Sequence, residues 1–237
     1  MGLPVLIPPP TTKLGETSTP QELVAWSLER FGDRNLVITT SFGMEGCALI
    51  DMYARHRRPL DIIYLDTMFF FPETYALRDR LAERYPHLSF INRGTTLTPE
   101  EQAEHFGPEL WKNNPDQCCK IRKVDPMNEV LTGADVWVTG LRRSQSETRA
   151  ALRVMEWDWK FQLIKFNPLV SWDRQQVWEY VQSHEVPYNE LHERGYPTLG
   201  CTHCTKPVEG SQIGDYTRAG RWTGTTKTEC GLHGDGI

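Results

Sequence analysis

The stretch LVITTSFGMEG, residues 36–46, decides the predicted fold. Its first five residues are apolar or β-branched, which is typical of a strand buried in a parallel sheet. Helical spacing follows at once, with apolar side chains at Cys47, Ile50 and Tyr53. A strand that leads directly into a helix is the first half of a strand–helix–strand unit, and it predicts an α/β fold.

The same alternation continues along the chain. Two expected helix starts carry a capping box, Thr19 with Glu22 and Thr98 with Glu101. Further expected strands are residues 60–65, 88–91, 135–140 and 161–166, and further expected helices are residues 73–85 and 172–183, with Ser171 as the cap of the last. The repeated units predict a mainly parallel sheet with helices on both faces.

The chain divides into three parts by composition. Residues 1–18 are rich in proline and threonine, so we expect a loosely ordered lead-in. Residues 19–209 hold the strand–helix units of the expected α/β domain. Residues 210–237 lack the apolar periodicity of a packed domain, and we expect a mobile C-terminal tail that carries a reactive group to the edge of the sheet.

The net charge of −5, from 31 acidic and 26 basic residues, argues against nucleic acid and anionic membranes as partners of the whole surface. The N-terminus has no signal-peptide pattern, and no stretch approaches the roughly 18 apolar residues of a membrane helix. A cytoplasmic protein is therefore expected. Its six cysteines favour metal binding or thiol chemistry over disulfides.

Ligands of doubly wound sheets bind beyond the carboxyl ends of the strands. The turn SFG at residues 41–43 lies there, and the backbone N–H groups of such a turn can bind phosphate or sulfate. An ordinary strand–helix turn is the alternative. Asp66 and Thr67 end the second strand at the same edge, and the aromatic run at 69–71 either lines a nucleotide pocket or belongs to the core.

Arginines gather in two places. Arg142, Arg143 and Arg149 follow directly on an expected strand and suit an anion clamp, while Arg218 and Arg221 form a second basic pair in the tail. Because arginine is common on protein surfaces, ordinary solvated side chains are the alternative for either group.

Four cysteines offer the thiolates that an iron–sulfur cluster or a structural zinc site needs: Cys118, Cys119, Cys201 and Cys204. Adjacent residues of a helix diverge by about 100°, and zinc ligands usually stand further apart in sequence, so the pair at 118–119 favours a cluster over zinc. Simple packing of the cysteines is the remaining alternative.

Arg122 and Lys123 follow the cysteine pair by four residues and share its helix faces, where cations would stabilise thiolates and an anionic substrate. A solvated basic helix face is the alternative. Cys230 stands alone in a glycine-flanked segment near the C-terminus, and a nearby cation would make its thiol a nucleophile. A free thiol without function is the other interpretation.

Taken together, these segments closely resemble the adenylyl-sulfate reductase branch of the sulfonucleotide reductase family. The matching segments, in the family's order, are SFG at 41–43, LDT at 65–67, FPET at 71–74, CCKIRK at 118–123, GLRRSQS at 140–146, GYPTLGCTHC at 195–204, RAGRW at 218–222 and ECGLH at 229–233. The resemblance implies an adenine nucleotide alpha hydrolase-like fold with a modified phosphate loop.

The resemblance also implies the chemistry. Cys230 would attack the sulfate sulfur of adenosine 5′-phosphosulfate, expel AMP and form an S-sulfocysteine, from which thioredoxin or glutaredoxin would release sulfite in sulfate assimilation. The four paired cysteines would hold a [4Fe-4S] cluster with a structural and electrostatic role. The implied substrate-binding residues are Ser41, Phe42, Gly43, Asp66, Thr67, Lys123, Gly140, Arg142, Arg143, Arg218, Arg221 and His233. A homo-oligomer is compatible with this interpretation.

Two positions depart from the family pattern. Met68 stands where many relatives have glycine, and residues 222–229 lack the aromatic run that some relatives carry. One alternative is the same chemistry on the 3′-phosphorylated substrate or on both, and another is a non-catalytic zinc and nucleotide-binding module. A tRNA-thiolating ATP pyrophosphatase is disfavoured, because Phe42 interrupts the glycine-rich loop that would cradle pyrophosphate.

Overall fold

The computed structural model describes residue 15 and residues 17–233 of the 237-residue chain. Most of the expected N-terminal lead-in and the last four residues of the expected tail therefore lie outside the described residues. In the part that is described, no helix combines the length and the apolar character that crossing a membrane requires.

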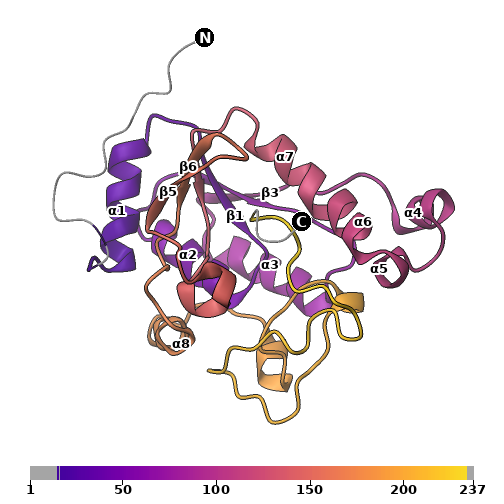
Figure 1. Cartoon of the computed structure of the whole chain (residues 1–237). Coiled ribbons are helices and arrows are strands. Elements are labelled where there is room, and N and C mark those ends of the chain that lie inside the picture. Colours follow the sequence, from indigo (N-terminus) through magenta and orange to yellow (C-terminus); the bar gives the residue numbers. More distant parts are fainter. Residues whose placement is uncertain (1–14, 16, 234–237) are drawn as a thin grey trace.

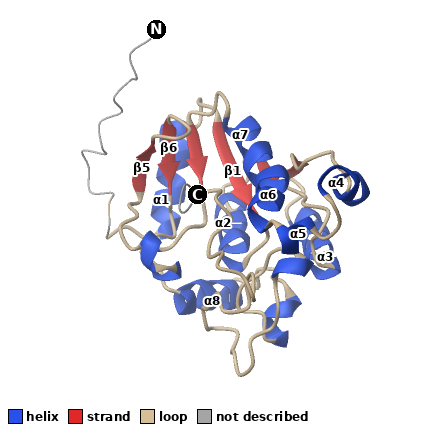
Figure 2. Ribbon diagram, turned by 45° about the vertical axis from the view of Figure 1, so that its right-hand side comes forward, coloured by secondary structure: helices blue, strands red, loops and turns tan. Residues whose placement is uncertain are grey.

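Six strands form one sheet in the order β3-β2-β1-β4-β6-β5 (Figure 2). The strands are β1 Leu36–Thr40, β2 Leu60–Tyr64, β3 Leu88–Asn92, β4 Val136–Val138, β5 Met155–Asp158 and β6 Leu163–Phe166. Every pairing is parallel except that of β5 with β6. The strand order changes direction between β1 and β4, so ligand binding is expected beyond the carboxyl ends of these two strands. The predicted fold class is confirmed.

The described residues form eight α-helices: α1 Pro20–Phe31, α2 Met44–Ala54, α3 Pro72–Arg84, α4 Pro99–Phe106, α5 Leu110–Asn113, α6 Pro115–Cys119, α7 Asp125–Leu131 and α8 Arg174–Ser183 (Figure 1). The capping boxes of Thr19 and Thr98 are both present. The prediction that Ser171 caps the last helix was wrong. Asp173 is the cap because Gln176, three residues later, returns the hydrogen bond, whereas the residue three after Ser171 is an arginine with no acceptor oxygen.

The two faces of the sheet bury alternate residues of each strand. Ile38 belongs to the larger core, which the sheet shares with α1, α2, α3 and α8. Val37 and Trp137 face the other way, against Leu131 of α7 and Leu232 of the tail. The sheet is therefore covered by helices on one face and by α7 and the C-terminal segment on the other (Figure 1).

A π-helical turn, Lys120–Val124, joins α6 to α7, and the Asp125 N–H donates to the Lys120 carbonyl across it. Such turns widen a helix locally and are common at functional sites. This one begins directly after Cys119, so the side chains of Arg122 and Lys123 leave the helix where it departs from α-helical geometry.

The described part of the tail runs back across the molecule to the carboxyl edge of the sheet (Figure 1). The Trp222 N–H donates to the Cys204 carbonyl, and Arg221 forms an isolated bridge with Thr205. At the end of this segment His233 stacks on Trp137, with ring centroids 5.0 Å apart. The boundary expected at residues 209–210 and the mobility of the tail stay predictions.

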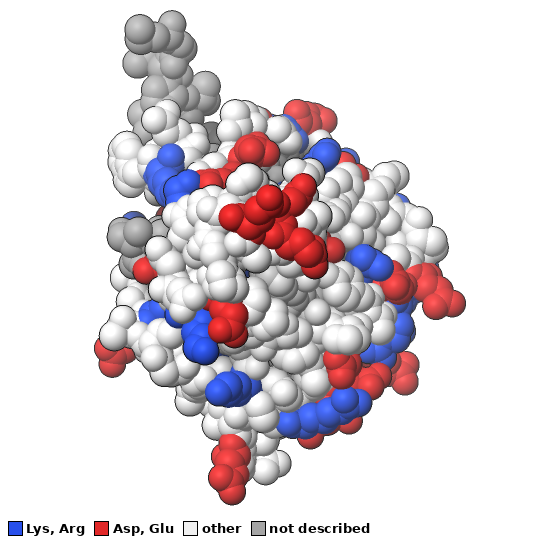
Figure 3. Space-filling view, turned by 90° about the vertical axis from the view of Figure 1, so that its right-hand side faces the viewer, with Lys and Arg blue, Asp and Glu red and all other residues white. Residues whose placement is uncertain are grey.

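Charged side chains are mixed on the face that carries α4, α5 and α6 (Figure 3). Figure 3 shows a mostly uncharged face with an acidic group near its upper centre and separate basic groups nearer its lower edge, so no continuous basic area covers this face. The pattern agrees with the net charge of −5.

Candidate active site

A cavity of 220 Å³ lies at the carboxyl edge of β1 and β4, where the strand order changes direction. The sequence-predicted site residues that line it are Ser41, Gly43, Thr67, Lys123, Gly140, Arg218, Arg221, Cys230 and His233. The cavity therefore gathers the loops after three strands, the cysteine-bearing helix and the C-terminal segment.

The turn after β1 presents backbone groups to the cavity. Phe42 adopts a φ of 58°, and its side chain is buried against Tyr64 and Phe90 instead of lining the cavity. Gly43 is the N-cap of α2 and provides no side-chain cap, so the first amides of the helix are available to an anion. A Cβ at Gly140 would lie 3.2 Å from Glu45 Cβ, so this glycine allows α2 to approach β4 closely.

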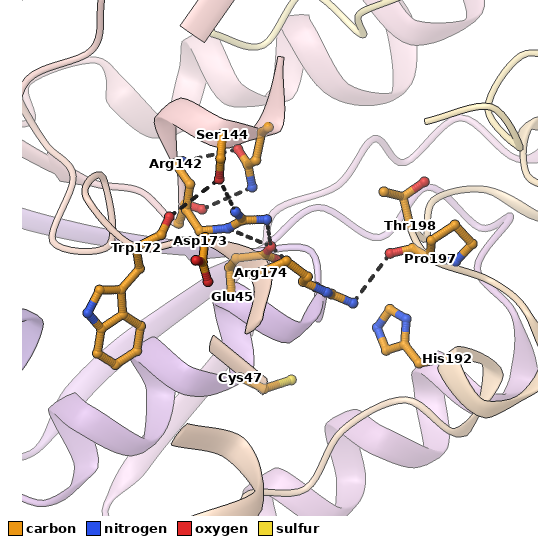
Figure 4. Close-up of polar contacts among 12 residues, drawn as sticks. Glu45, Cys47, Arg142, Ser144, Trp172, Asp173, Arg174, His192, Pro197 and Thr198 are labelled. Carbon is orange, nitrogen blue, oxygen red and sulfur yellow. Dashed lines mark hydrogen bonds and ion pairs between the residues drawn. The ribbon is translucent and has the colours of Figure 1, made fainter. Parts of the chain in front are cut away.

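A buried charge network lies behind this turn (Figure 4). Glu45 Oε1 accepts hydrogen bonds from Arg142 Nε at 3.0 Å, from Arg142 Nη2 at 2.8 Å and from Arg174 Nη1 at 3.3 Å. Burial raises the pKa of Glu45, but the guanidinium groups of Arg174 and Arg142 outweigh burial and lower this pKa to about 2. Glu45 and Arg174 both line the cavity. The sequence analysis singled out neither, although Glu45 stands in the quoted turn, because its partners Arg142 and Arg174 lie far away in the sequence.

Replacing Glu45 with Gln is expected to destabilise the protein by about 3 kcal/mol at pH 7, because two buried guanidinium groups lose their counter-charge. The folded-state pKa of about 2 lies below the ordinary 4.5, so the contribution of Glu45 is fully present above pH 4.5 and is lost as pH falls towards 2. Denaturant unfolding of wild type and variant at pH 7 and pH 3 should therefore show a smaller gap at pH 3. The exposed Glu83→Gln serves as control, and a gap independent of pH would contradict the assignment.

Besides Phe42, three predicted substrate-binding residues point away from the cavity. Arg142 is fully buried between Glu45 and the ring of Tyr216. Arg143 Nε donates to the Leu152 carbonyl, at 2.7 Å. Asp66 accepts hydrogen bonds from the Met68 N–H and the Tyr75 hydroxyl. None of the three lines the cavity, and direct substrate contact by them stays a prediction.

The backbone explains the departure at Met68. This residue has a φ of 57°, in the left-handed region that favours glycine. The Asp66 carboxylate accepts the Met68 N–H at 2.7 Å and supports the turn, and the side chain is 38% exposed. A glycine at this position would adopt the same turn without steric cost, so methionine here is accommodated by solvent exposure.

Cations form the wall opposite the turn. The guanidinium of Arg221 lies 4.4 Å from the ring centroid of Trp222, and that of Arg218 lies 5.4 Å from it. Arg221 also donates to the carbonyl of Leu199 at 3.0 Å. A Cβ at Gly200 would collide with the Arg221 guanidinium, so glycine is required there for the arginine to reach its place.

Lys123 connects the cavity to the cysteines. Burial lowers the pKa of Lys123, but the thiolates of Cys201, Cys119 and Cys230 outweigh burial and raise it. Lys123 therefore stays protonated at neutral pH. Lys123 also lines the larger cavity together with Cys230.

The paired cysteines line a small second cavity of 10 Å³ with Phe69, Trp111, Arg122, Lys123 and His203. Cys118, Cys119, Cys201 and Cys204 are all free thiols. Arg122 is buried beside them, with its Nε donating to Gln102 at 2.7 Å and its Nη1 donating to the Thr67 carbonyl at 2.9 Å. The three phenylalanines at 69–71 have different surroundings. Phe69 lines the small cavity with the cysteines, Phe70 lines the larger cavity, and Phe71 packs on Tyr196.

Two histidines line the larger cavity, and both are neutral at pH 7. Burial and nearby cations, first Lys165, hold the pKa of His233 well below its usual range, so this ring offers a hydrogen bond but not a full charge. Burial and the Arg174 guanidinium lower the pKa of His192 to about 4, and its Nδ1 donates to the Tyr196 carbonyl at 2.7 Å. The sequence analysis did not single out His192, although it stands only three residues before the matched GYPTLGCTHC segment.

Comparisons with known proteins identify the family of the chain. Residues 35–207 match the phosphoadenosine phosphosulfate reductase domain. A protein of Staphylococcus saprophyticus named adenosine 5′-phosphosulfate reductase is 46% identical over 218 residues, which cover 92% of this chain and 88% of the relative. A protein of Shouchella clausii with the same name is 45% identical, covering 90% of this chain and 86% of the relative.

Solved structures give the same answer. The phosphoadenylyl-sulfate reductase of Candida auris, in complex with phosphate, matches with a TM-score of 0.70 and 35% identity over 81% of this chain and 91% of that one. The FMN adenylyltransferase of Candida glabrata, at 17% identity and a TM-score of 0.54, shares the fold alone. The chain belongs to the phosphoadenosine phosphosulfate reductase family.

Proposed function

We propose that the protein reduces adenosine 5′-phosphosulfate to sulfite and AMP, with Cys230 as the nucleophile. One observation carries the proposal: Cys230 lines the same cavity as Lys123, Arg218 and Arg221. A thiol surrounded by cations at the switch point of an α/β sheet suits attack on a nucleotide-linked anion. The names of the curated relatives support the unphosphorylated substrate.

The reaction takes two displacements at sulfur. The Cys230 thiolate attacks the sulfate sulfur, the bond from that sulfur to the bridging oxygen breaks, and AMP leaves with the electron pair. The enzyme then carries an S-sulfocysteine. A thiolate of the reductant attacks the Cys230 sulfur, sulfite leaves, and the second thiol of the reductant resolves the mixed disulfide.

The cations of the wall give the first step its electrostatic support. An anionic thiolate must approach an anionic sulfate, and the two repel each other. Positive charge beside them offsets this repulsion. Lys123, Arg218 and Arg221 occupy that wall, and the first amides of α2 at Gly43 offer donors to the phosphate.

The reductant is external in this proposal. Four of the six cysteines line the small second cavity, and Cys47 is fully buried in the core. Burial raises the pKa of Cys47 to about 12, so this thiol is unreactive. In this proposal the four paired cysteines serve as cluster ligands, and a dithiol protein such as thioredoxin or glutaredoxin supplies the two electrons. Free thiols also suit the reducing cytoplasm.

We further propose that Cys118, Cys119, Cys201 and Cys204 hold a [4Fe-4S] cluster. All four line one cavity beside the cations Arg122 and Lys123, which fits an anionic group. Within the described residues, no three His, Cys, Asp or Glu side chains converge on a point as ligands of a single ion would. Four cysteines supply the one thiolate per iron that such a cluster takes, and the adjacent pair at 118–119 favours a cluster over zinc. When bound, the cluster would hold the four cysteines together. Its charge would act on the substrate site electrostatically through Lys123.

The decisive experiment measures sulfite release by anaerobically purified protein with thioredoxin, comparing the two adenosine sulfates at matched concentration. We expect a strong preference for the unphosphorylated substrate. The Candida auris structure favours the 3′-phosphorylated substrate as a second candidate, and a preference for it would change the substrate without changing the chemistry. No sulfite from either, together with bound zinc in place of iron, would favour the non-catalytic module.

A further inference from the structure

A buried carboxylate next to the proposed nucleophile has no part in the chemistry described so far. Glu229 directly precedes Cys230, is 7% exposed and lines the larger cavity. Its Oε2 accepts a hydrogen bond from Arg149 Nη2 at 3.0 Å and another from Arg218 Nη2 at 3.0 Å. Burying a carboxylate is costly unless it is paired, so the two arginines are what allow Glu229 to lie there.

The two arginines come from different parts of the chain. Arg149 ends the short 3-10 turn Glu147–Arg149 in the loop after β4, and its Nη1 donates to Gln145 of the same loop. Arg218 belongs to the C-terminal segment, and its Nη2 also donates to the Thr228 carbonyl at 2.8 Å. One carboxylate oxygen thus joins the segment that carries Cys230 to a loop of the α/β domain.

The position of the Glu229 carboxylate on the cavity wall is unusual for a site that binds an anion. The cavity is proposed to receive a nucleotide anion, and a carboxylate on its wall opposes anion binding. The charge of Glu229 therefore does not favour direct binding of the substrate. We expect its role to be the placement of neighbouring groups. The groups that it places are Arg218, which lines the cavity, and Cys230, which is the next residue.

We propose that Glu229 is a positioning residue, whose carboxylate fastens the C-terminal segment to Arg149 and holds Arg218 and Cys230 at the anion site. The assignment rests on the proposed function of Cys230 and adds a role for the residue before it. Glu229 touches neither the substrate nor the reacting sulfur in this assignment, and it acts through the residues that it places.

The test uses the holoenzyme and Glu229→Gln, which keeps the shape of the side chain and removes its charge. We expect kcat for sulfite formation to fall by about 10-fold or more, because a buried ion pair is broken. AMP binding should change little, because the loss of a negative charge from the cavity and the release of Arg218 have opposite effects on a bound anion. Alkylation of Cys230 by iodoacetamide, followed by mass spectrometry of its peptide, should become about 10-fold faster as the segment is released.

Two further variants complete the design. Glu229→Asp keeps the charge on a shorter side chain and should recover part of the loss in kcat. If Glu229→Gln does not fold, Glu229→Asp is compared with wild type in its place. Glu209→Gln removes an exposed carboxylate 20 residues earlier in the chain and should behave as wild type. Equal circular dichroism and equal iron content establish that the variants are comparable.

The outcomes separate the alternatives. Weaker AMP binding in Glu229→Gln, with unchanged alkylation of Cys230, would overturn the proposal and make Glu229 part of the nucleotide site. An unchanged kcat would overturn it as well. If wild type formed no sulfite, the proposed function would fail, but the alkylation and AMP-binding results would still decide whether Glu229 fastens the segment.

Discussion

Cys230→Ser is expected to abolish sulfite release, with a loss of at least about 1,000-fold, and to leave AMP binding and iron content unchanged. A serine hydroxyl is not ionised at neutral pH and cannot form the sulfur–sulfur bond that the two-step reaction needs. Cys230 is only half-buried, so the isosteric change should not disturb the fold. The measurement is sulfite formation with thioredoxin, together with equilibrium binding of AMP.

A second readout identifies the intermediate. Wild-type protein incubated with adenosine 5′-phosphosulfate but without reductant should gain one SO3 group on the Cys230 peptide, and Cys230→Ser should gain none. Cys47→Ala is the matched control, because this thiol is fully buried in the core and outside both cavities. Retained turnover in Cys230→Ser would remove this residue from the mechanism.

Cys201→Ser is expected to lose most of the bound iron and the broad visible absorption of a cluster. Cys201 is 6% exposed and lines the small cavity with the other three paired cysteines. Removing one of four ligands weakens a metal site strongly, and binding energy that supports folding is lost with it. We therefore also expect a lower thermal unfolding midpoint, measured anaerobically beside iron and sulfide content.

Cys47→Ala again provides the control for this change, since it removes a thiol without removing a proposed ligand and should keep full iron content. Wild-type levels of iron in Cys201→Ser would contradict the ligand assignment. If the wild-type protein contained stoichiometric zinc, a structural zinc site would replace the cluster in the proposed assignment. The prediction for Cys230 would not be affected.

The fold of this protein does not by itself determine the reaction that it catalyses. The FMN adenylyltransferase of Candida glabrata has a related fold at 17% identity, although its name describes a different reaction. The residues that distinguish the present site stand in loops and in the C-terminal segment, which add chemistry to a common sheet. The assignment of function therefore depends on Cys230 and on the cations around it.

Local features of the chain were predictable from the sequence because their causes are local. The strand Leu36–Thr40 and the capping boxes at Thr19 and Thr98 depend on residues within a few positions of one another. The edge strand β5 was missed because its four residues lack a buried pattern and are held in place mainly by pairing with β6.

Only the tertiary structure decided which side chains face the cavity. Arg142 and Arg221 both stand in arginine-rich motifs, but Glu45 holds the first in the interior, whereas Trp222 and Leu199 hold the second at the cavity wall. The roles of Glu45 and Glu229 could not be foreseen for the same reason. The direction of a charged side chain is determined by counter-charges that lie far away in sequence, and only folding brings those partners within hydrogen-bond distance.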